Sequence, residues 1–170
     1  AMNRAVKEFL LTQPNEILNK TREIVMETFE KSDEDVNDGM DIALCSINTE
    51  TKKLHFAGAN NGLYMVRDGE LTEIKPDKQP IGNYQDAKPF THHEVDLQEG
   101  DVIYTFSDGY PDQFGGPKGK KFMYKSFRNL LVDIHQKPMN EQHNILIKSF
   151  NDWKGDLEQI DDVCIIGVRI

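Results

Sequence analysis

The stretch DVIYTFSDGYPDQFGG, Asp101 to Gly116, starts as a core strand and ends in carboxylates and glycines. Up to Phe106 it is a run of β-branched and aromatic residues, which is typical of a buried strand. Asp108 and Asp112 follow at once. Residue types alone leave two interpretations open: a surface turn, or a metal site whose carboxylate is held by the end of a rigid strand.

Composition narrows the class of protein. A chain of 170 residues fits one domain with a single sizeable core. Its 29 acidic and 20 basic residues give a net charge of -9, which disfavours non-specific binding to nucleic acid or to an anionic membrane. Cys45 and Cys164 lie in apolar, strand-like runs, so we expect reduced, buried thiols. No apolar run approaches the ~20 residues of a membrane span and no signal peptide is visible, so we expect a cytoplasmic domain that does not insert into a membrane.

The hydrophobic pattern predicts helices at both ends and strands between them. Apolar residues at helical spacing predict two helices before the acidic segment at residues 31–41, with a break at Thr12 to Pro14. Strand-like runs follow as far as Phe106, and Asp68-Gly69 has the signature of a type I′ hairpin turn. No function beyond that turn is needed to explain the pair.

The last third of the chain predicts two amphipathic helices and a final buried strand. The helices cover residues 122–135 and 139–155, Pro138 marks the break between them, and the strand covers residues 161–170. The complete pattern is two helices, about six strands, two helices and one strand. It predicts an α+β fold in which sheet and helices segregate.

Acidic residues at strand ends or turns form three candidate metal-binding motifs. Hard cations such as Mg²⁺ and Mn²⁺ prefer oxygen ligands, and a strand end directs a carboxylate better than a mobile loop does. Converging carboxylates repel one another unless a cation lies between them. Each motif taken alone is also compatible with a turn or a strand boundary. The motifs are NDGMD (Asp38, Asp41), SDGYPD (Asp108, Asp112) and QIDDVC (Asp161, Asp162).

Other polar motifs point less clearly to a site. The acidic segment DEDVNDGMD has its glycine one place late for an EF-hand loop and lacks the closing glutamate. His92 and His93 alternate faces, and neither has a carboxylate or cysteine at ligand spacing along the chain, so we expect surface residues. The segment GGPKGKK, residues 115–121, fits a cationic flap over an anionic substrate and fits a plain exposed loop equally well.

Five segments together resemble the SpoIIE-type, RsbU-like branch of the PPM metal-dependent serine/threonine phosphatases. The resemblance runs from the second helix to Ile170 and rests on the order and spacing of the segments. It implies an αββα sandwich of two antiparallel sheets flanked by helices, with a two-metal centre at one end. The segments are NDGMDIALCSIN, LHFAGANNGLYMVRDGEL, PIGNY, GDVIYTFSDGYPDQFGG and DDVCIIGVRI.

The resemblance also implies which residues carry the chemistry. The aspartate of the SDG motif and the first aspartate of the DD motif correspond to metal ligands and catalytic residues, which are Asp108 and Asp161 here. Asp162 is a further metal candidate beside them, and Asp38 is a candidate for an additional ion. The candidates for contact with the substrate are the glycine of the SDG motif, Gly109, and two lysines of the basic loop, Lys118 and Lys120.

The implied reaction is hydrolysis of phosphoserine or phosphothreonine on a protein by metal-activated water, with two Mn²⁺ or Mg²⁺ ions. Members of the branch act on STAS-domain anti-anti-sigma factors in bacterial signalling and follow an upstream sensor domain. The sequence does not reveal the substrate, the sensor, the choice between Mn²⁺ and Mg²⁺, or the oligomer.

One family motif, an aspartate-rich D-x-x-G-H-G segment, is not in this chain. We therefore expect residues 1–170 to be the C-terminal three quarters or so of one phosphatase domain, without its first strands and inactive or weakly active alone.

An open sheet edge would favour a homodimer. The first two helices either cover a sheet or act as the regulatory switch that the resemblance implies. Two alternatives remain, a pseudophosphatase that binds a partner without chemistry and an acidic, cation-binding structural domain.

Overall fold

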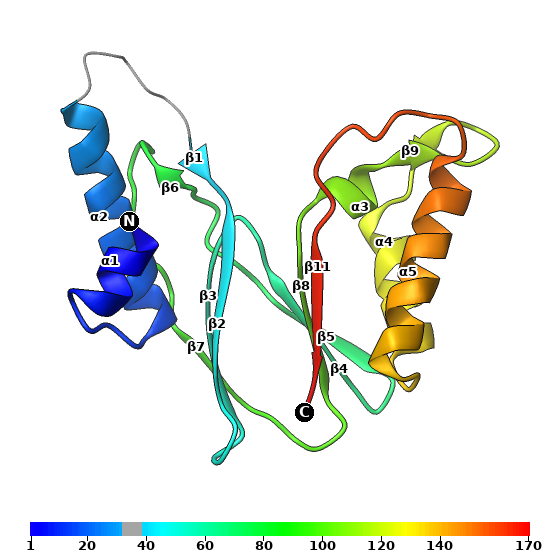
Figure 1. Ribbon diagram of the computed structural model, residues 1–170, viewed down its shortest axis with the longest axis horizontal. Coiled ribbons are helices and arrows are strands. Elements are labelled where there is room, and N and C mark those ends of the chain that lie inside the picture. Colours follow the sequence, from blue (N-terminus) through cyan, green and yellow to red (C-terminus); the bar gives the residue numbers. More distant parts are fainter. Residues whose placement is uncertain (32–38) are drawn as a thin grey trace. The chain divides into compact units, whose positions relative to one another are not determined.

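The computed structural model describes residues 1–31 and 39–170, which divide into two compact units. The first unit contains residues 1–63 and 74–98, and the second contains residues 64–73 and 99–170. The predicted α+β composition is confirmed, since helices and antiparallel strand pairs form separate runs of the chain (Figure 1). The assignment of the whole chain to one domain stays a prediction.

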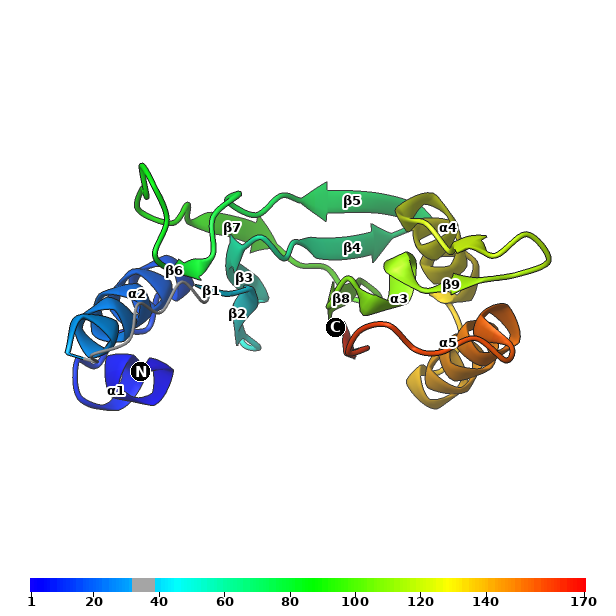
Figure 2. The same ribbon diagram turned by 90° about the horizontal axis from the view of Figure 1, so that it is seen from above.

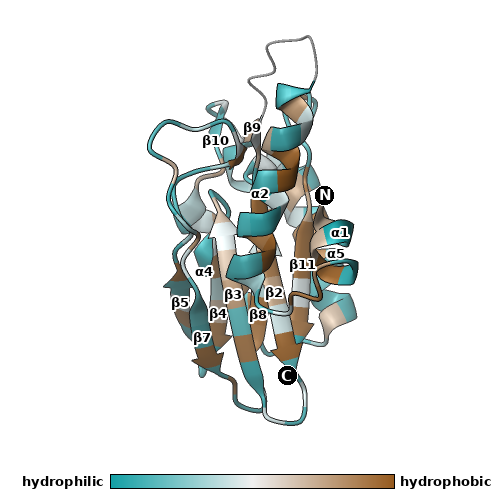
Figure 3. Ribbon diagram, turned by 90° about the vertical axis from the view of Figure 1, so that its left-hand side faces the viewer, coloured by the Kyte–Doolittle hydropathy of each residue, from teal (hydrophilic) through white to brown (hydrophobic). Residues whose placement is uncertain are grey.

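Two helices open the first unit, with the predicted break between them. They are α1 (Met2–Lys7) and α2 (Pro14–Glu30). Proline suits the first turn of a helix because its missing N–H has no partner there, and Glu16 places a negative charge near the positive end of the helix dipole. Figure 3 shows hydrophobic and hydrophilic residues alternating along α2, as a helix that covers a core requires.

Three antiparallel strands form the main sheet of the first unit, in the order β2, β3, β7. Leu18 of α2 is fully buried and packs with Ala57, Ala59, Ile81 and Phe90. This cluster joins the helix to β3 and to the loop that carries β6. The strands are β2 (Ile42–Asn48), β3 (Lys53–Ala59) and β7 (His93–Asp96), with β1 (Gly39–Met40) paired to β6 (Ile81–Gly82).

The second unit has a four-stranded sheet in the order β11, β8, β4, β5. Its strands are β4 (Leu63–Arg67), β5 (Glu70–Ile74), β8 (Val102–Phe106) and β11 (Ile165–Arg169). Figure 2 shows β4 and β5 side by side. Asp68 and Gly69 between them have φ of 50° and 82°. Positive φ at both central residues is what a type I′ turn requires, so the predicted hairpin is confirmed.

Helices cover this sheet through an aromatic core. After β8 come α3 (Gly109–Asp112), the pair β9 (Phe114–Gly115) and β10 (Lys120–Lys121), then α4 (Tyr124–Ile134) and α5 (Met139–Lys154). Pro138 caps α5 at the predicted break. The buried cluster joins β4, β8, α3, α4 and α5, so this core fixes where β8 ends. Its members include Tyr64, Tyr104, Tyr110, Phe127, Leu131, Leu146 and Phe150.

The start of β8 is held by a buried ion pair. The Asp101 side chain is 1 % exposed, and both its oxygens accept hydrogen bonds from the Arg67 guanidinium at 2.8 and 2.6 Å. A bidentate pair of this kind satisfies a carboxylate that burial would otherwise make costly. Asp101 therefore fixes the strand at the end away from Asp108.

The prediction that the last strand is buried is wrong. β11 forms an edge of the described sheet, and Ile166 and Val168 are 58 % and 39 % exposed. Cys164 is also exposed, against the expectation of a buried thiol. Cys45 on β2 is partly buried, and burial raises the pKa of its thiol to about 12. An apolar run in the sequence indicates a strand that could be buried, but it does not show whether other elements pack against both faces of that strand.

Among residues 1–31 and 39–170, no helix is both long enough and apolar enough to cross a membrane.

Candidate functional site

The structure brings the SDG and DDVC segments together at one end of the second unit's sheet. Ser107 follows β8 and lies against the chain just before β11. Its amide donates to the Cys164 carbonyl at 3.0 Å, its Oγ donates to the Asp162 carbonyl at 2.7 Å, and it accepts from the Cys164 amide at 2.9 Å. These three hydrogen bonds, the Ser107 clamp, place Asp108 beside the segment that carries Asp161 and Asp162.

Gly109 is required by this close approach. A Cβ at this position would lie 2.4 Å from the carbonyl oxygen of Asp162 and 2.9 Å from its carbonyl carbon. Both are backbone atoms, which cannot move aside as a side chain can. Gly109 therefore lets the turn after β8 pack directly against the Asp162 backbone. Its assignment as a substrate contact stays a prediction.

The carboxylates themselves are exposed. Asp108, Asp161 and Asp162 are all exposed to solvent. The Asp162 amide donates to Oδ1 of Asp161 at 2.7 Å, and Gln159 Nε2 donates to the Asp161 carbonyl at 2.8 Å. The backbone around the two aspartates is thus fixed, while their free oxygens can reach a solvent-borne cation.

A buried glutamine holds the loop that leads to these aspartates. Gln113 is fully buried at the end of α3 and donates from Nε2 to the Glu158 carbonyl at 2.9 Å. Its own carbonyl accepts from Trp153 Nε1 at 3.0 Å. The loop after α5 is therefore attached to the turn after β8 at a second point, away from the Ser107 clamp.

Two further residues lie near Asp108: Asp112, from the same SDGYPD motif, and Tyr124, which belongs to none of the candidate motifs. Asp112 forms an ion pair with Lys121 at 2.9 Å. Burial, followed by the negative charges of Asp112 and Asp108, raises the pKa of Tyr124 to about 12. The phenol therefore stays protonated near these carboxylates and can donate a hydrogen bond. The sequence did not predict this role, because Tyr124 is simply the first residue of the amphipathic helix α4 and lies in no recognisable motif.

The basic segment at residues 115–121 forms the short hairpin of β9 and β10. Lys118 and Lys120 are exposed on it. The base of the hairpin is anchored to α5, because the Gly116 amide donates to the Trp153 carbonyl at 2.7 Å and a Cβ on Gly115 would meet the same oxygen at 1.9 Å. The interpretation as a cationic flap and the interpretation as an exposed loop both stay open.

The aspartates do not form a ready-made site of three ligands. In the part of the chain that the structure describes, one group of three potential ligand side chains has its ligand atoms within 4.8 Å of one another, and it contains none of these aspartates. Asp41 accepts a hydrogen bond from Asn60 at 2.8 Å in the first unit. Asp38 lies outside the described residues, so its predicted role is not tested.

The family model for stage II sporulation protein E, SpoIIE, matches residues 1–170. Among solved structures, the SiaA-PP2C domain of Pseudomonas aeruginosa is 28 % identical with a TM-score of 0.89, and the match covers 100 % of this chain and 66 % of that one. No curated protein matches the chain.

Two further solved structures share the fold at lower identity. The PP2C phosphatase domain with part of the regulatory domain of SpoIIE from Bacillus subtilis is 15 % identical with a TM-score of 0.74. The RsbU and RsbW domains of Rv1364c from Mycobacterium tuberculosis are 14 % identical with a TM-score of 0.72. The matches cover 99 % of this chain in both cases, and 47 % and 45 % of those chains. With the family model matched over its whole length, this chain belongs to the SpoIIE family and has the fold of PP2C phosphatase domains.

Proposed function

We propose that this chain is part of a metal-dependent phosphatase that removes phosphate from phosphoserine or phosphothreonine on a protein. The observation that carries the proposal is the Ser107 clamp, which brings the carboxylate segments of Asp108 and Asp161 to one end of a rigid sheet. Family membership and the PP2C fold support the same reaction.

The donor set fits a hard dication. The candidate ligands Asp108, Asp161 and Asp162 offer exposed carboxylate oxygens, which Mg²⁺ and Mn²⁺ prefer. A solved structure of RsbX in complex with magnesium shares the fold, with a TM-score of 0.63 at 14 % identity. When bound, such ions lower the pKa of a coordinated water and neutralise charge on the phosphate.

The surrounding residues would position the phosphate. Lys118 and Lys120 are exposed cations on the hairpin that follows α3, suited to attract a phosphoprotein. The protonated hydroxyl of Tyr124, near Asp108, can donate to a phosphate oxygen. Gly109 keeps the turn close to the Asp162 backbone, so that no side chain fills the space between the two segments.

We place the substrate among STAS-domain phosphoproteins of bacterial signalling, and the protein in the cytoplasm with its family. An upstream sensor domain and a homodimer complete this proposal. The similarity to SpoIIE and to the RsbU and RsbW domains supports a regulatory setting.

Mn²⁺ binding tests the site directly. We expect calorimetric titration of the 170-residue chain to show binding that weakens at least about tenfold in Asp108→Asn and in Asp161→Asn, because each loses a charged ligand. Asp133→Asn, at an exposed position on α4, is the matched control and should bind as the unchanged chain does. Equal affinity in all four proteins would refute the assignment of ligands.

Activity is a separate question. Among residues 1–31 and 39–170, no three ligand side chains converge at this end, and we propose that the chain alone hydrolyses p-nitrophenyl phosphate slowly or not at all. Robust Mn²⁺-stimulated turnover would contradict this. A phosphorylated STAS-domain protein is the substrate to compare, since a preference for it over the small ester would support the proposed target.

A second candidate function is a pseudophosphatase that binds a phosphoprotein without hydrolysing it. It is favoured because, among the described residues, no three ligand side chains converge around Asp108 and Asp161. It predicts binding of the phosphorylated partner that is unchanged in Asp108→Asn. The phosphatase proposal predicts instead that Mn²⁺ strengthens this binding and that Asp108→Asn removes the effect.

A further inference from the structure

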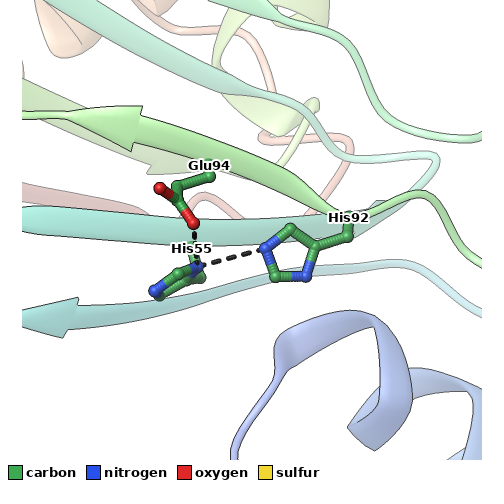
Figure 4. Close-up of side chains that lie close together, drawn as sticks. All are labelled: His55, His92 and Glu94. Atoms are coloured by element: carbon green, nitrogen blue, oxygen red, sulfur yellow. Dashed lines mark hydrogen bonds and ion pairs between the residues drawn. The ribbon is translucent and has the colours of Figure 1, made fainter.

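A second cluster of ligand side chains lies in the first unit. His55, His92 and Glu94 each offer a ligand atom, and these atoms all lie within 4.8 Å of one another (Figure 4). Nδ1 of His55 is 3.1 Å from Nε2 of His92 and 3.8 Å from Oε2 of Glu94. The elements that hold them, β3 and β7, contribute none of the aspartates of the proposed phosphatase site.

Strand pairing explains why the three side chains meet. His55 on β3 is the direct cross-strand partner of Glu94 on β7, so the two side chains share a face of the sheet. His92 precedes Glu94 by two residues and lies on that face as well. His93 points the other way, where its ring packs 5.8 Å from that of buried Phe56.

The ring of His92 is oriented by the start of α2. Its Nδ1 lies 3.1 Å from Oδ1 of Asn15. An amide oxygen only accepts hydrogen bonds, so Nδ1 carries a proton; in the neutral ring the Nε2 lone pair then accepts the hydrogen bond from His55 Nδ1 when no metal is bound. That lone pair faces His55. A histidine that donates one ring N–H to a neighbouring oxygen while its other nitrogen faces a metal is the usual arrangement in metal sites.

One oxygen of Glu94 is paired with its neighbour Lys53. The Lys53 ammonium donates a hydrogen bond to Oε1. Oε2, the oxygen nearer His55, is the one facing the cluster. Lys53 also lies 3.4 Å from Asp96, which offers its ammonium group an alternative partner.

We propose that His55 Nδ1, His92 Nε2 and Glu94 Oε2 form a binding site for a borderline dication of the Zn²⁺ type. Two imidazoles and one carboxylate suit zinc, with the fourth position open to water. Tetrahedral zinc with bonds of about 2.0 to 2.2 Å places its ligand atoms about 3.3 to 3.5 Å apart. The observed 3.1 and 3.8 Å bracket that spacing.

The bound ion would connect three elements that meet at this face. It would link β3 to the edge strand β7 directly and would fix His92, whose other nitrogen bonds to Asn15 in the first turn of α2. Binding to the folded state alone raises stability in proportion to the logarithm of metal concentration. The site therefore predicts a zinc-dependent rise in melting temperature.

The site can be tested by letting the 170-residue chain compete with a chromophoric chelator for Zn²⁺, in the presence of excess Mg²⁺. We expect one saturable Zn²⁺ site, lost in His55→Ala and in His92→Ala and weakened in Glu94→Gln. Lys53→Met should bind Zn²⁺ roughly two- to fivefold more tightly, because a nearby positive charge is gone. The Co²⁺ complex should show the visible absorption bands of a four-coordinate ion with nitrogen ligands.

Two controls separate this site from others. His143→Ala, at an exposed position on α5, should bind Zn²⁺ as the unchanged chain does. Asp108→Asn should also leave Zn²⁺ binding intact, so a failed phosphatase proposal and a failed zinc proposal give different results. Far-UV circular dichroism identifies any variant that does not fold.

The proposal is overturned if no saturable site appears, or if the double variant His55→Ala, His92→Ala binds as tightly as the unchanged chain. A hydrogen-bond chain from Asn15 through His92 to His55, without metal, predicts the first of these results. If His55→Ala fails to fold, exposed His92→Ala decides, since its side chain is not part of the core. Zinc that does not raise the melting temperature of the unchanged chain also counts against the site.

Discussion

At the Asp108 end of the second unit, hydrogen bonds between Ser107 and backbone groups hold two chain segments together. At the His55 cluster of the first unit, the ligand side chains themselves lie together. Ser107 joins Asp108 to the Asp162 segment by three hydrogen bonds, yet these aspartates belong to no group of three converging ligand atoms among the described residues. His55, His92 and Glu94 do form such a group.

The two regions should therefore respond to different changes. A site framed by backbone depends on close packing, so small changes in volume should disturb it most. A site made of side chains on a strand face depends on charge and protonation, and should tolerate changes of packing elsewhere. Substitutions in each region test this contrast, beginning with the largest expected effect.

Gly109→Ala should be the most damaging single change at the Asp108 end. The new Cβ would lie 2.4 Å from the Asp162 carbonyl oxygen, so the two segments must separate. Overpacking of this kind costs about 1 to 3 kcal/mol, and we expect Mn²⁺ affinity to fall with it. Urea unfolding gives the change in the free energy of unfolding, and calorimetry gives the affinity.

Gly119→Asn is the control for Gly109→Ala. A Cβ added at Gly119 would have nothing within 4 Å, and the φ of 56° at this position is one that asparagine tolerates. The substitution should change stability and Mn²⁺ affinity little. If Gly109→Ala is equally mild, the close approach of the segments is not what supports the site.

Ser107→Ala should have a smaller effect at the same end. It removes the hydrogen bond to the Asp162 carbonyl and the one from the Cys164 amide. Both bonds are exposed to solvent, so each falls in the lower part of the usual range of about 0.5 to 1.5 kcal/mol. We therefore expect a loss of about 1 to 2 kcal/mol in urea unfolding, and weaker Mn²⁺ binding. Ser126→Ala, exposed on α4, provides the baseline. A Zn²⁺ affinity that changed with Ser107→Ala would break the contrast between the two regions.

Much of the fold was predictable because local rules agree with the tertiary structure. The helices follow from apolar spacing, Pro138 sits at a helix start, and Asp68-Gly69 forms the expected hairpin turn. β11 departed from expectation because an apolar sequence does not show what covers each face, and Ile166 is exposed on an edge strand.

The two candidate sites also differ in how far the sequence alone predicts them. Asp108 and Asp161 are visible in the sequence because each lies in a short motif at a strand boundary, although their roles as ligands stay predictions. His55 and His92 are separated by 37 positions and meet through hydrogen bonds between β3 and β7. Spacing along the chain could not find them, since the register of the two strands supplies the contact.

The smallest predicted effect concerns the Lys53–Glu94 ion pair beside the histidines. Hydrogen bonding between the two lowers the pKa of Glu94 and raises that of Lys53. The Glu94 contribution to stability is present above its unfolded pKa of about 4.3 and is lost as pH falls through the lower folded value. The Lys53 contribution is present below about 10.4 and is lost as pH rises through the higher folded value.

The melting temperature of the unchanged chain should therefore exceed that of Lys53→Met by a small margin between these limits, and the margin should close toward either extreme. Both groups are exposed, so added salt should shrink the margin as well. Thermal melts of the two proteins over this pH range, at low and high salt and without zinc, measure it. A margin independent of both pH and salt would mean that packing of the Lys53 side chain, rather than charge, governs this region, and the contrast with the Asp108 end would fail.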